Sequence, residues 1–362
     1  MGKLNFNPGP TALPLEVLQK AKEGLSNFAD TGFSILELSH RSQAYQSIHD
    51  NATKSLAAYL NIPDSHDILL LQGGASLQFT MVPMNLLGQK KTAYHIVTGS
   101  WSKKAYKESK KIGPTEILAS SKERDFAYIP PESEWKPVPE SAQGYLHITS
   151  NNTIYGTQWR ELPHVSSLPL VVDMSSDIGT KPIPWENVDI AYAGAQKNLG
   201  AAGVTVVVIR KDLLTGDSTG LPAMLDYRVH AEKGSLYNTP PTFNIFVLQL
   251  MVQWLNDQGG LQAFEARSLD KSKRLYDVID RSDDFYIGHA ERSSRSTMNV
   301  TFRLQDEELT KVFLSKANEA GIIGINGHRS MGGCRVSLYN GIGIEACERL
   351  VDFMQAFKRN YS

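Results

Sequence analysis

The chain has 362 residues, of which 41% are hydrophobic and 21% charged, and its formal net charge is −1. Such a chain is long enough for two globular domains with sizeable cores. The near-zero charge excludes an overall field that would draw the protein to nucleic acid or to a membrane surface, so we expect neither as a partner.

The two cysteines, Cys334 and Cys347, do not form a CxxC pair, and we expect no metal site. A chain with few cysteines suits the reducing cytoplasm, which is the location we expect. The N-terminal residues contain no apolar signal core, and no apolar run approaches the ~20 residues that cross a bilayer.

The first 120 residues alternate between helix and strand patterns. Residues 1–15 are rich in proline and glycine and cannot form a regular helix or a central strand. Apolar spacing then predicts helices over 15–28, 43–60, 76–87 and 102–111, and strands over 68–71, 93–97 and 116–118.

The alternation continues after a polar, proline-rich loop at 121–143. Four further strands are predicted over 145–149, 170–173, 188–192 and 204–209. Strands that alternate with helices favour an α/β fold, so we expect a large domain with a mostly parallel seven-stranded sheet.

The pattern changes after a long apolar helix predicted over 242–257. The Gly259-Gly260 pair breaks the chain there. Helices predicted over 261–281, 306–320 and 343–357 then mix with strands over 297–302 and 334–338. We therefore expect a large domain of residues 16–258 and a small α+β domain of residues 1–15 and 259–362.

Several residues with chemical potential follow predicted strands. Lys197 lies in a loop of small residues, Asp173 ends a strand, Ser76 follows the Gly73-Gly74 turn, and Trp101 comes directly after another strand. The carboxyl ends of parallel strands form the usual ligand-binding edge of such sheets. Taken singly, each residue has an ordinary explanation, such as a solvated lysine or an aspartate in a turn.

Together these residues match the needs of pyridoxal phosphate (PLP). That cofactor requires a lysine amine for its aldehyde, an acid that keeps its pyridine nitrogen protonated, and donors for its phosphate. Free N–H groups after a glycine turn, at a helix N-terminus, bind phosphate well. The sequence therefore favours a PLP site around Lys197 and Asp173.

Three basic segments indicate an acidic substrate. The His40-Arg41 pair, the His328-Arg329 pair and Arg335 all lie in or beside turns rich in glycine or serine. Arginine grips carboxylates and phosphates with two parallel hydrogen bonds. The alternative for each segment is an ordinary surface ion pair.

With these residues in view, the chain resembles the phosphoserine aminotransferase family, which belongs to the class V aminotransferases and to PLP enzymes of fold type I. The resemblance covers essentially the whole chain. The segments that carry it are residues 7–11 (NPGPT), 39–42 (SHRS), 73–76 (GGAS), 99–102 (GSWS), 150–156 (SNNTIYG), 173–177 (DMSSD), 194–198 (GAQKN) and 237–241 (YNTPP).

The resemblance implies roles for four residues around the cofactor ring. Lys197 would bind the cofactor aldehyde covalently, and Asp173 would pair with the pyridine nitrogen. Trp101 would stack on the ring, and Thr153 would bond the side of the ring that carries the 3-hydroxyl group. Lys197 and Asp173 would thus be the catalytic residues.

It also implies that the cofactor phosphate is bound by Ala75, Ser76 and Gln196. Asn238 and Thr239 would reach the phosphate from a partner subunit, so the enzyme would be a homodimer with shared active sites. Some relatives carry arginine where this chain has Ser76, and that anion contact does not carry over.

The substrate residues implied by the resemblance are the basic ones. Arg41 and Arg335 would bind the acidic groups of the amino acid. His40, His328 and Arg329 would complete the pocket for the phosphate or side-chain carboxylate, with the last two contributed by the other subunit.

The implied reaction is reversible transamination of 3-phosphoserine with 2-oxoglutarate, which gives 3-phosphooxypyruvate and glutamate in serine biosynthesis. Relatives also accept 4-phosphooxy-threonine in pyridoxine biosynthesis. The alternatives are another fold type I PLP enzyme, such as an alanine–glyoxylate aminotransferase or a cysteine desulfurase, and a PLP-binding protein without catalysis. Neither cysteine suits a desulfurase, because Cys334 begins a predicted strand and Cys347 lies in a predicted helix.

Overall fold

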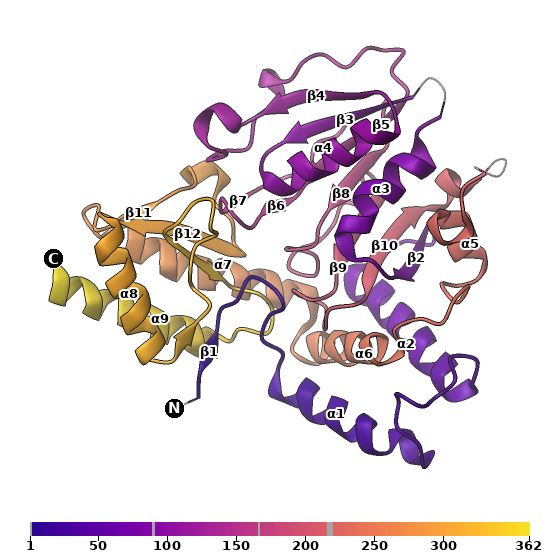
Figure 1. The fold of residues 1–362 in the computed structure, drawn as a ribbon, viewed down its shortest axis with the longest axis horizontal. Coiled ribbons are helices and arrows are strands. Elements are labelled where there is room, and N and C mark those ends of the chain that lie inside the picture. The colour runs from indigo at the N-terminus through magenta and orange to yellow at the C-terminus, as the bar shows by residue number, and fades with distance from the viewer. Residues whose placement is uncertain (1, 89–90, 166, 216–219) are drawn as a thin grey trace.

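The structure, a computed structural model, describes residues 2–88, 91–165, 167–215 and 220–362. Figure 1 shows a larger part built on one sheet and a smaller part that carries both ends of the chain. In the described residues the large sheet has seven strands in the order β2-β10-β9-β8-β5-β3-β4. The expected α/β fold with a mostly parallel sheet is confirmed.

Five neighbouring strands of the sheet run parallel, from β9 through β8, β5 and β3 to β4. Strand β10 is antiparallel to both β9 and β2. Residues 195–204, which link β9 to β10, are too few for the crossover of roughly a dozen residues that a parallel pair needs. The strands are β2 (His66–Leu71), β3 (Thr92–Val97), β4 (Thr115–Ser120), β5 (Gly144–Thr149), β8 (Leu170–Asp173), β9 (Ile190–Gly194) and β10 (Thr205–Arg210).

Helices cover both faces of the sheet. On one face, Val171 and Ile190 share a core with residues of α3 and α4; on the other, Val172 and Ala191 share a core with residues of α2 and α6. Successive strand residues point to opposite faces, so a sheet covered twice needs strands that are apolar throughout. The helices of this part are α1 (Leu15–Ser26), α2 (Gln43–Leu60), α3 (Gly74–Leu86), α4 (Ser100–Ile112), α5 (Tyr227–Glu232) and α6 (Thr242–Asp257).

The smaller part joins the N-terminal residues to the chain after α6. Strand β1 (Leu4–Asn5) pairs in parallel with β13 (Ile322–Ile323), and Phe6 is buried in the same core as Phe302 and Phe313. The other elements of this part are α7 (Gly260–Asp280), β11 (Tyr286–Gly288), β12 (Asn299–Leu304), α8 (Glu307–Glu319), β14 (Cys334–Ser337) and α9 (Ile344–Tyr361).

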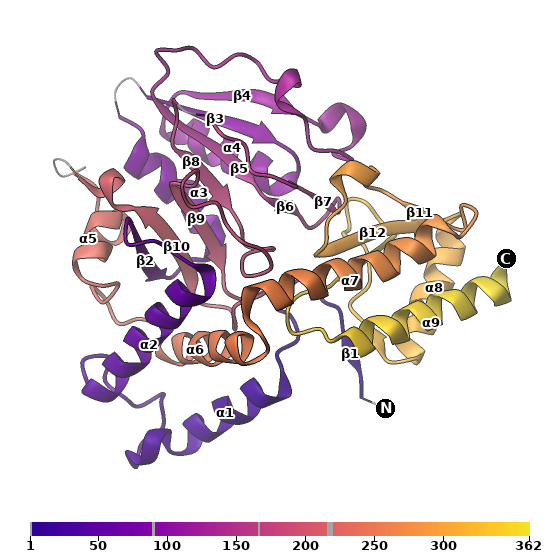
Figure 2. The ribbon, with the colours of Figure 1, turned by 180° about the vertical axis from the view of Figure 1, so that it is seen from behind.

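Helix α7 connects the two parts, and Figure 2 shows it running from beside α6 to the smaller part. Its first turns bury Leu261 and Phe264 in the core of the larger part, whereas Leu275 is buried in the core of the smaller one. No helix in the described ranges combines the length and the apolar character that crossing a membrane requires.

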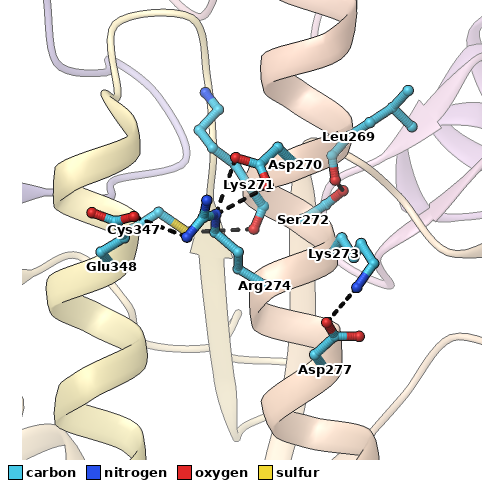
Figure 3. A network of polar contacts seen from close by, with 9 residues as sticks. All are labelled: Leu269, Asp270, Lys271, Ser272, Lys273, Arg274, Asp277, Cys347 and Glu348. Atoms are coloured by element: carbon cyan, nitrogen blue, oxygen red, sulfur yellow. Dashed lines mark hydrogen bonds and ion pairs between the residues drawn. The ribbon is translucent and has the colours of Figure 1, made fainter.

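A buried lysine holds the end of β14 against α7. The Lys271 ammonium donates hydrogen bonds to the backbone carbonyls of Leu338, Tyr339 and Ile342 at 2.8, 3.1 and 3.0 Å. Burial lowers its pKa to about 8. Figure 3 shows the neighbouring contact, in which Arg274 of α7 reaches Glu348 of α9. Lys271 therefore satisfies carbonyl groups that have no strand partner.

Replacing Lys271 by methionine is expected to lower the free energy of unfolding by about 3 kcal/mol, because three carbonyl groups lose a charged donor inside the protein. Urea unfolding measures the change. The matched control is Lys273→Met on the same helix, whose lysine is exposed and pairs with Asp277. The control should change stability by less than about 0.5 kcal/mol; equal effects of the two variants would contradict the role of Lys271.

Candidate active site

A cavity of about 290 Å³ opens where the carboxyl ends of β5 and β8 meet the smaller part. Its walls come from the N-terminal segment, the sheet edge, the starts of α3 and α4, and the strand β14. Nine of the residues proposed from the sequence line it: Ala75, Ser76, Trp101, Thr153, Asp173, Gln196, Lys197, His328 and Arg335.

Lys197 lies in the loop that follows β9, and its side chain lines the cavity. The N-terminal segment fixes this loop, because the Thr11 hydroxyl donates to the Lys197 carbonyl at 2.7 Å and the Thr11 N–H donates to the Gln196 carbonyl at 3.2 Å. Burial lowers the pKa of the Lys197 amine, while Asp173 raises it and Arg335 lowers it further. With its pKa lowered, the Lys197 amine is neutral more often in the cavity than it would be in water.

Asp173 ends β8 and is 5% exposed. Its Oδ1 accepts hydrogen bonds from the Ser175 hydroxyl at 2.6 Å and from the Ser175 N–H at 3.0 Å. Within the described residues Oδ2 accepts none. Burial raises the pKa of this carboxyl, against the two Ser175 bonds and the charge of Lys197. A buried carboxylate with one free oxygen is ready for a cationic or N–H partner in the cavity.

The first turn of α3 offers backbone N–H groups to the cavity. Gly73 and Gly74 have φ angles of 89° and 66°, a conformation that glycine adopts without strain, and they turn the chain from β2 into the helix. Ala75 and Ser76 follow in that first turn, which contains no acidic residue. The unpaired N–H groups and the helix dipole favour an anion here.

Trp101 stands in the first turn of α4, and its indole N–H donates to the Thr153 hydroxyl at 3.3 Å. This hydrogen bond connects the Trp101 side of the cavity to the segment of residues 150–156. A flat aromatic wall of this kind suits a planar ring in the cavity.

Two basic groups enter the cavity from the smaller part. Arg335 of β14 is 8% exposed, and its guanidinium donates to the Thr153 carbonyl at 3.4 Å. His328 lies in the loop before β14, and burial lowers its pKa. Because His328 lines the cavity that holds Lys197 of the same chain, the expectation that it comes from the partner subunit is wrong.

Five of the proposed residues do not line this cavity in one chain: His40, Arg41, Asn238, Thr239 and Arg329. Arg41 is exposed in the turn before α2, with His40 beside it. Asn238 lines a separate cavity with Gly73 and Pro240, and Gln72 donates to the Thr239 carbonyl at 3.1 Å. Arg329 is exposed next to His328.

The structure adds residues that sequence reasoning missed. Ser175 orients Asp173, and Thr11 holds the lysine loop. A Cβ atom on Gly9 would lie 3.5 Å from Cγ of Lys197, so this segment passes close over the lysine. The NPGPT and DMSSD segments were the only signals for these three contacts, and neither signal says what its members touch.

The residues present fit PLP. A partly buried amine, a carboxylate with a free oxygen and an anion-binding helix start line one cavity, and each matches a different part of that cofactor. The described residues contain no group of three metal-ligating side chains in one place.

Comparison with known proteins agrees with this geometry. The Aminotransferase class-V family model matches residues 3–350. Phosphoserine aminotransferase of Geobacillus kaustophilus is 55% identical, over 99% of both chains. A solved phosphoserine aminotransferase is 51% identical, over 99% of this chain and 100% of that one, with a TM-score of 0.97.

The PLP-bound phosphoserine aminotransferase of Trichomonas vaginalis is more distant. It is 34% identical, over 98% of this chain and 99% of that one, with a TM-score of 0.92. The family model spans every segment that builds the cavity. The chain belongs to the class V aminotransferases and, within them, to the phosphoserine aminotransferase family.

Proposed function

We propose that the protein is a PLP-dependent phosphoserine aminotransferase, which moves the amino group of 3-phosphoserine to 2-oxoglutarate and gives 3-phosphooxypyruvate and glutamate. One observation carries this proposal: Lys197 and Asp173 share a cavity with basic groups that have no carboxylate partner among the described residues, Arg335 foremost. Such a cavity suits an amino acid with two acidic groups. The analogue 4-phosphooxy-threonine has the same groups and is a second candidate substrate.

The bound cofactor supplies the electron sink that makes the substrate Cα proton removable. Lys197 holds the cofactor and then carries that proton, since burial favours the neutral, basic form of its amine. Asp173 keeps the pyridine nitrogen protonated through its free oxygen. Ala75, Ser76 and Gln196 bind the phosphate, while Trp101 and Thr153 hold the ring.

Arg335 binds the substrate α-carboxylate with its fork of donors. His328 and Arg329 face the acidic group at the other end of the substrate. An alanine–glyoxylate aminotransferase would need no such second cationic group, which argues against that alternative. A PLP-binding protein without catalysis is the remaining alternative.

The visible spectrum of the purified protein tests this function. We expect the absorbance band of the bound cofactor to disappear on addition of 3-phosphoserine and to return on addition of 2-oxoglutarate, because the cofactor that Lys197 would hold would supply amino-group transfer from the first compound to the second. A band that does not respond to 3-phosphoserine would contradict the proposed substrate. A band that responds to no amino acid would favour the non-catalytic alternative.

We also propose a cytoplasmic homodimer, with residues 16–258 as its large domain and residues 1–15 and 259–362 as its small domain. The two cysteines, Cys334 and Cys347, are free and buried, which suits a reducing compartment. Phe33 and Leu36 are 58% and 63% exposed, a few residues before the His40-Arg41 pair in the sequence. An apolar surface of this kind favours contact with a second copy, which would bring His40, Arg41, Asn238 and Thr239 to the partner's cavity.

Mixed dimers test this sharing. Arg41→Ala is expected to lower kcat/KM for 3-phosphoserine about 100-fold, and Lys197→Ala to be inactive. A dimer of one copy of each, isolated by two affinity tags, should recover about half of the wild-type activity, because one cavity then has both Lys197 and a partner Arg41. A mixed dimer no more active than its parents would place Arg41 at the cavity of its own chain.

A further inference from the structure

A lysine outside the proposed site stands over the aromatic wall of the cavity. The Lys104 ammonium lies 4.2 Å from the ring centre of Trp101. Both residues belong to α4, where side chains three positions apart share one face. The attraction between a cation and an indole face holds the charge there, although Lys104 is exposed to solvent. Lys104 does not itself line the cavity, but it places a positive charge beside the wall that Trp101 forms.

This charge joins two guanidinium groups and an imidazole. His328 and Arg335 line the cavity, and Arg329 is adjacent to His328 in sequence. Besides burial, the charges of Arg335, Arg329 and Lys104 all lower the pKa of His328, so these three cations lie within electrostatic reach of His328. Elements far apart in the sequence, α4 and the chain before and within β14, therefore converge on one cationic mouth.

These charges are not balanced within the chain. Among the described residues, no salt bridge joins Lys104, Arg329 or Arg335 to a carboxylate, whereas Lys111 on the same helix as Lys104 pairs with Glu108 at 2.8 Å. Like charges gathered without counterions repel one another and are stabilised by an anion. The attraction is strongest for the anion that carries the most negative charge.

We propose that Lys104 is a specificity residue that draws the phosphate of the substrate to the mouth of the cavity and so favours phosphorylated over unphosphorylated amino acids. This inference rests on the proposed function. Lys104 makes no contact with the reacting atoms, so it acts on the affinity for substrate and leaves the chemical step unchanged.

The test compares Lys104→Met with Lys103→Met, a neighbour that has the same charge and is also exposed, but makes no cation–π contact with Trp101 in the described part of the chain. Lys104→Met is expected to raise KM about tenfold for 3-phosphoserine and about threefold for glutamate, at unchanged kcat, because phosphate carries nearly twice the charge of a carboxylate. The difference should shrink to less than about twofold in 0.5 M KCl. Lys104→Arg should restore the wild-type KM, and Lys103→Met should behave as wild type.

The outcomes separate the two proposals. Wild-type protein that turns over 3-phosphoserine, with Lys104→Met no different from Lys103→Met, overturns the role of Lys104 alone. A loss that is equal for both substrates and insensitive to salt also overturns it, since it shows that Lys104 only supports Trp101. Wild-type protein without activity on 3-phosphoserine overturns the proposed function and this inference with it.

Discussion

Replacing Lys197 by alanine is expected to lower turnover by about 10⁴-fold or more and to remove the visible absorbance of the bound cofactor. Lys197 is the only lysine that lines the cavity in the described part of the chain, so no other amine can take its place. Steady-state kinetics and the visible spectrum of the purified variant measure both effects. A variant that keeps the absorbance band and the activity would rule out Lys197 as the attachment point.

Two controls separate chemistry from folding. Burial lowers the pKa of the Lys197 amine, which means that burying its charge opposes folding. The cofactor-free variant should therefore melt at the same temperature as the cofactor-free wild-type protein, or at a higher one. Added methylamine should restore part of the activity, because a small free amine fits the space that the lost side chain leaves. A low melting temperature without rescue would show instead that the variant had lost its structure.

Much of the fold could be read from apolar runs. The segment Leu170–Asp173 is buried along its length, and Thr205–Arg210 is buried except at Arg210; such strands are recognisable because both faces are covered. The short pairs β1–β13 and β6–β7 (Asn151–Asn152 with Thr157–Gln158) were not foreseen, since two residues give no periodicity. They arise from tertiary contacts, and β1–β13 joins residues over 300 positions apart.

Site residues could be predicted from the sequence where they lie at the carboxyl end of a sheet strand, because the ends of neighbouring parallel strands lie close together. Asp173 ends β8 and Lys197 follows the neighbouring strand β9, so their meeting follows from topology. The partners that orient them could not be predicted in the same way. The Ser175 hydroxyl turns back to Asp173 within a local turn, and Thr11 reaches the lysine loop from the other end of the sequence.

The proposed residues that do not line the cavity show a second limit of prediction from the sequence. Arg41 and Asn238 are carried by surface segments of one chain, and sequence alone does not tell which copy a surface residue serves. The error on His328 has the same origin, because the loop before β14 folds back over its own chain. Only three-dimensional placement distinguishes these cases.

Replacing Asp173 by asparagine is expected to lower kcat by about 10³-fold, because the amide cannot hold a proton on the pyridine nitrogen. The substitution keeps the shape of the side chain and an oxygen for the two Ser175 hydrogen bonds. Steady-state kinetics with saturating cofactor measure the loss. Turnover within about threefold of wild type would contradict the role of Asp173.

Asp173→Asn lowers turnover, but it should not lower the stability of the cofactor-free protein. Burial raises the pKa of Asp173 in the folded protein, so folding binds a proton between the unfolded and folded pKa values, and stability falls as the pH rises through that window. Asparagine has no such titration. The cofactor-free Asp173→Asn variant should therefore be at least as stable as wild type at pH 7, with a difference that shrinks toward pH 4. Thermal melts of both proteins at pH 7 and pH 4 measure this difference. If the variant loses stability relative to wild type on going from pH 4 to pH 7, Asp173 supports the fold as well as the reaction.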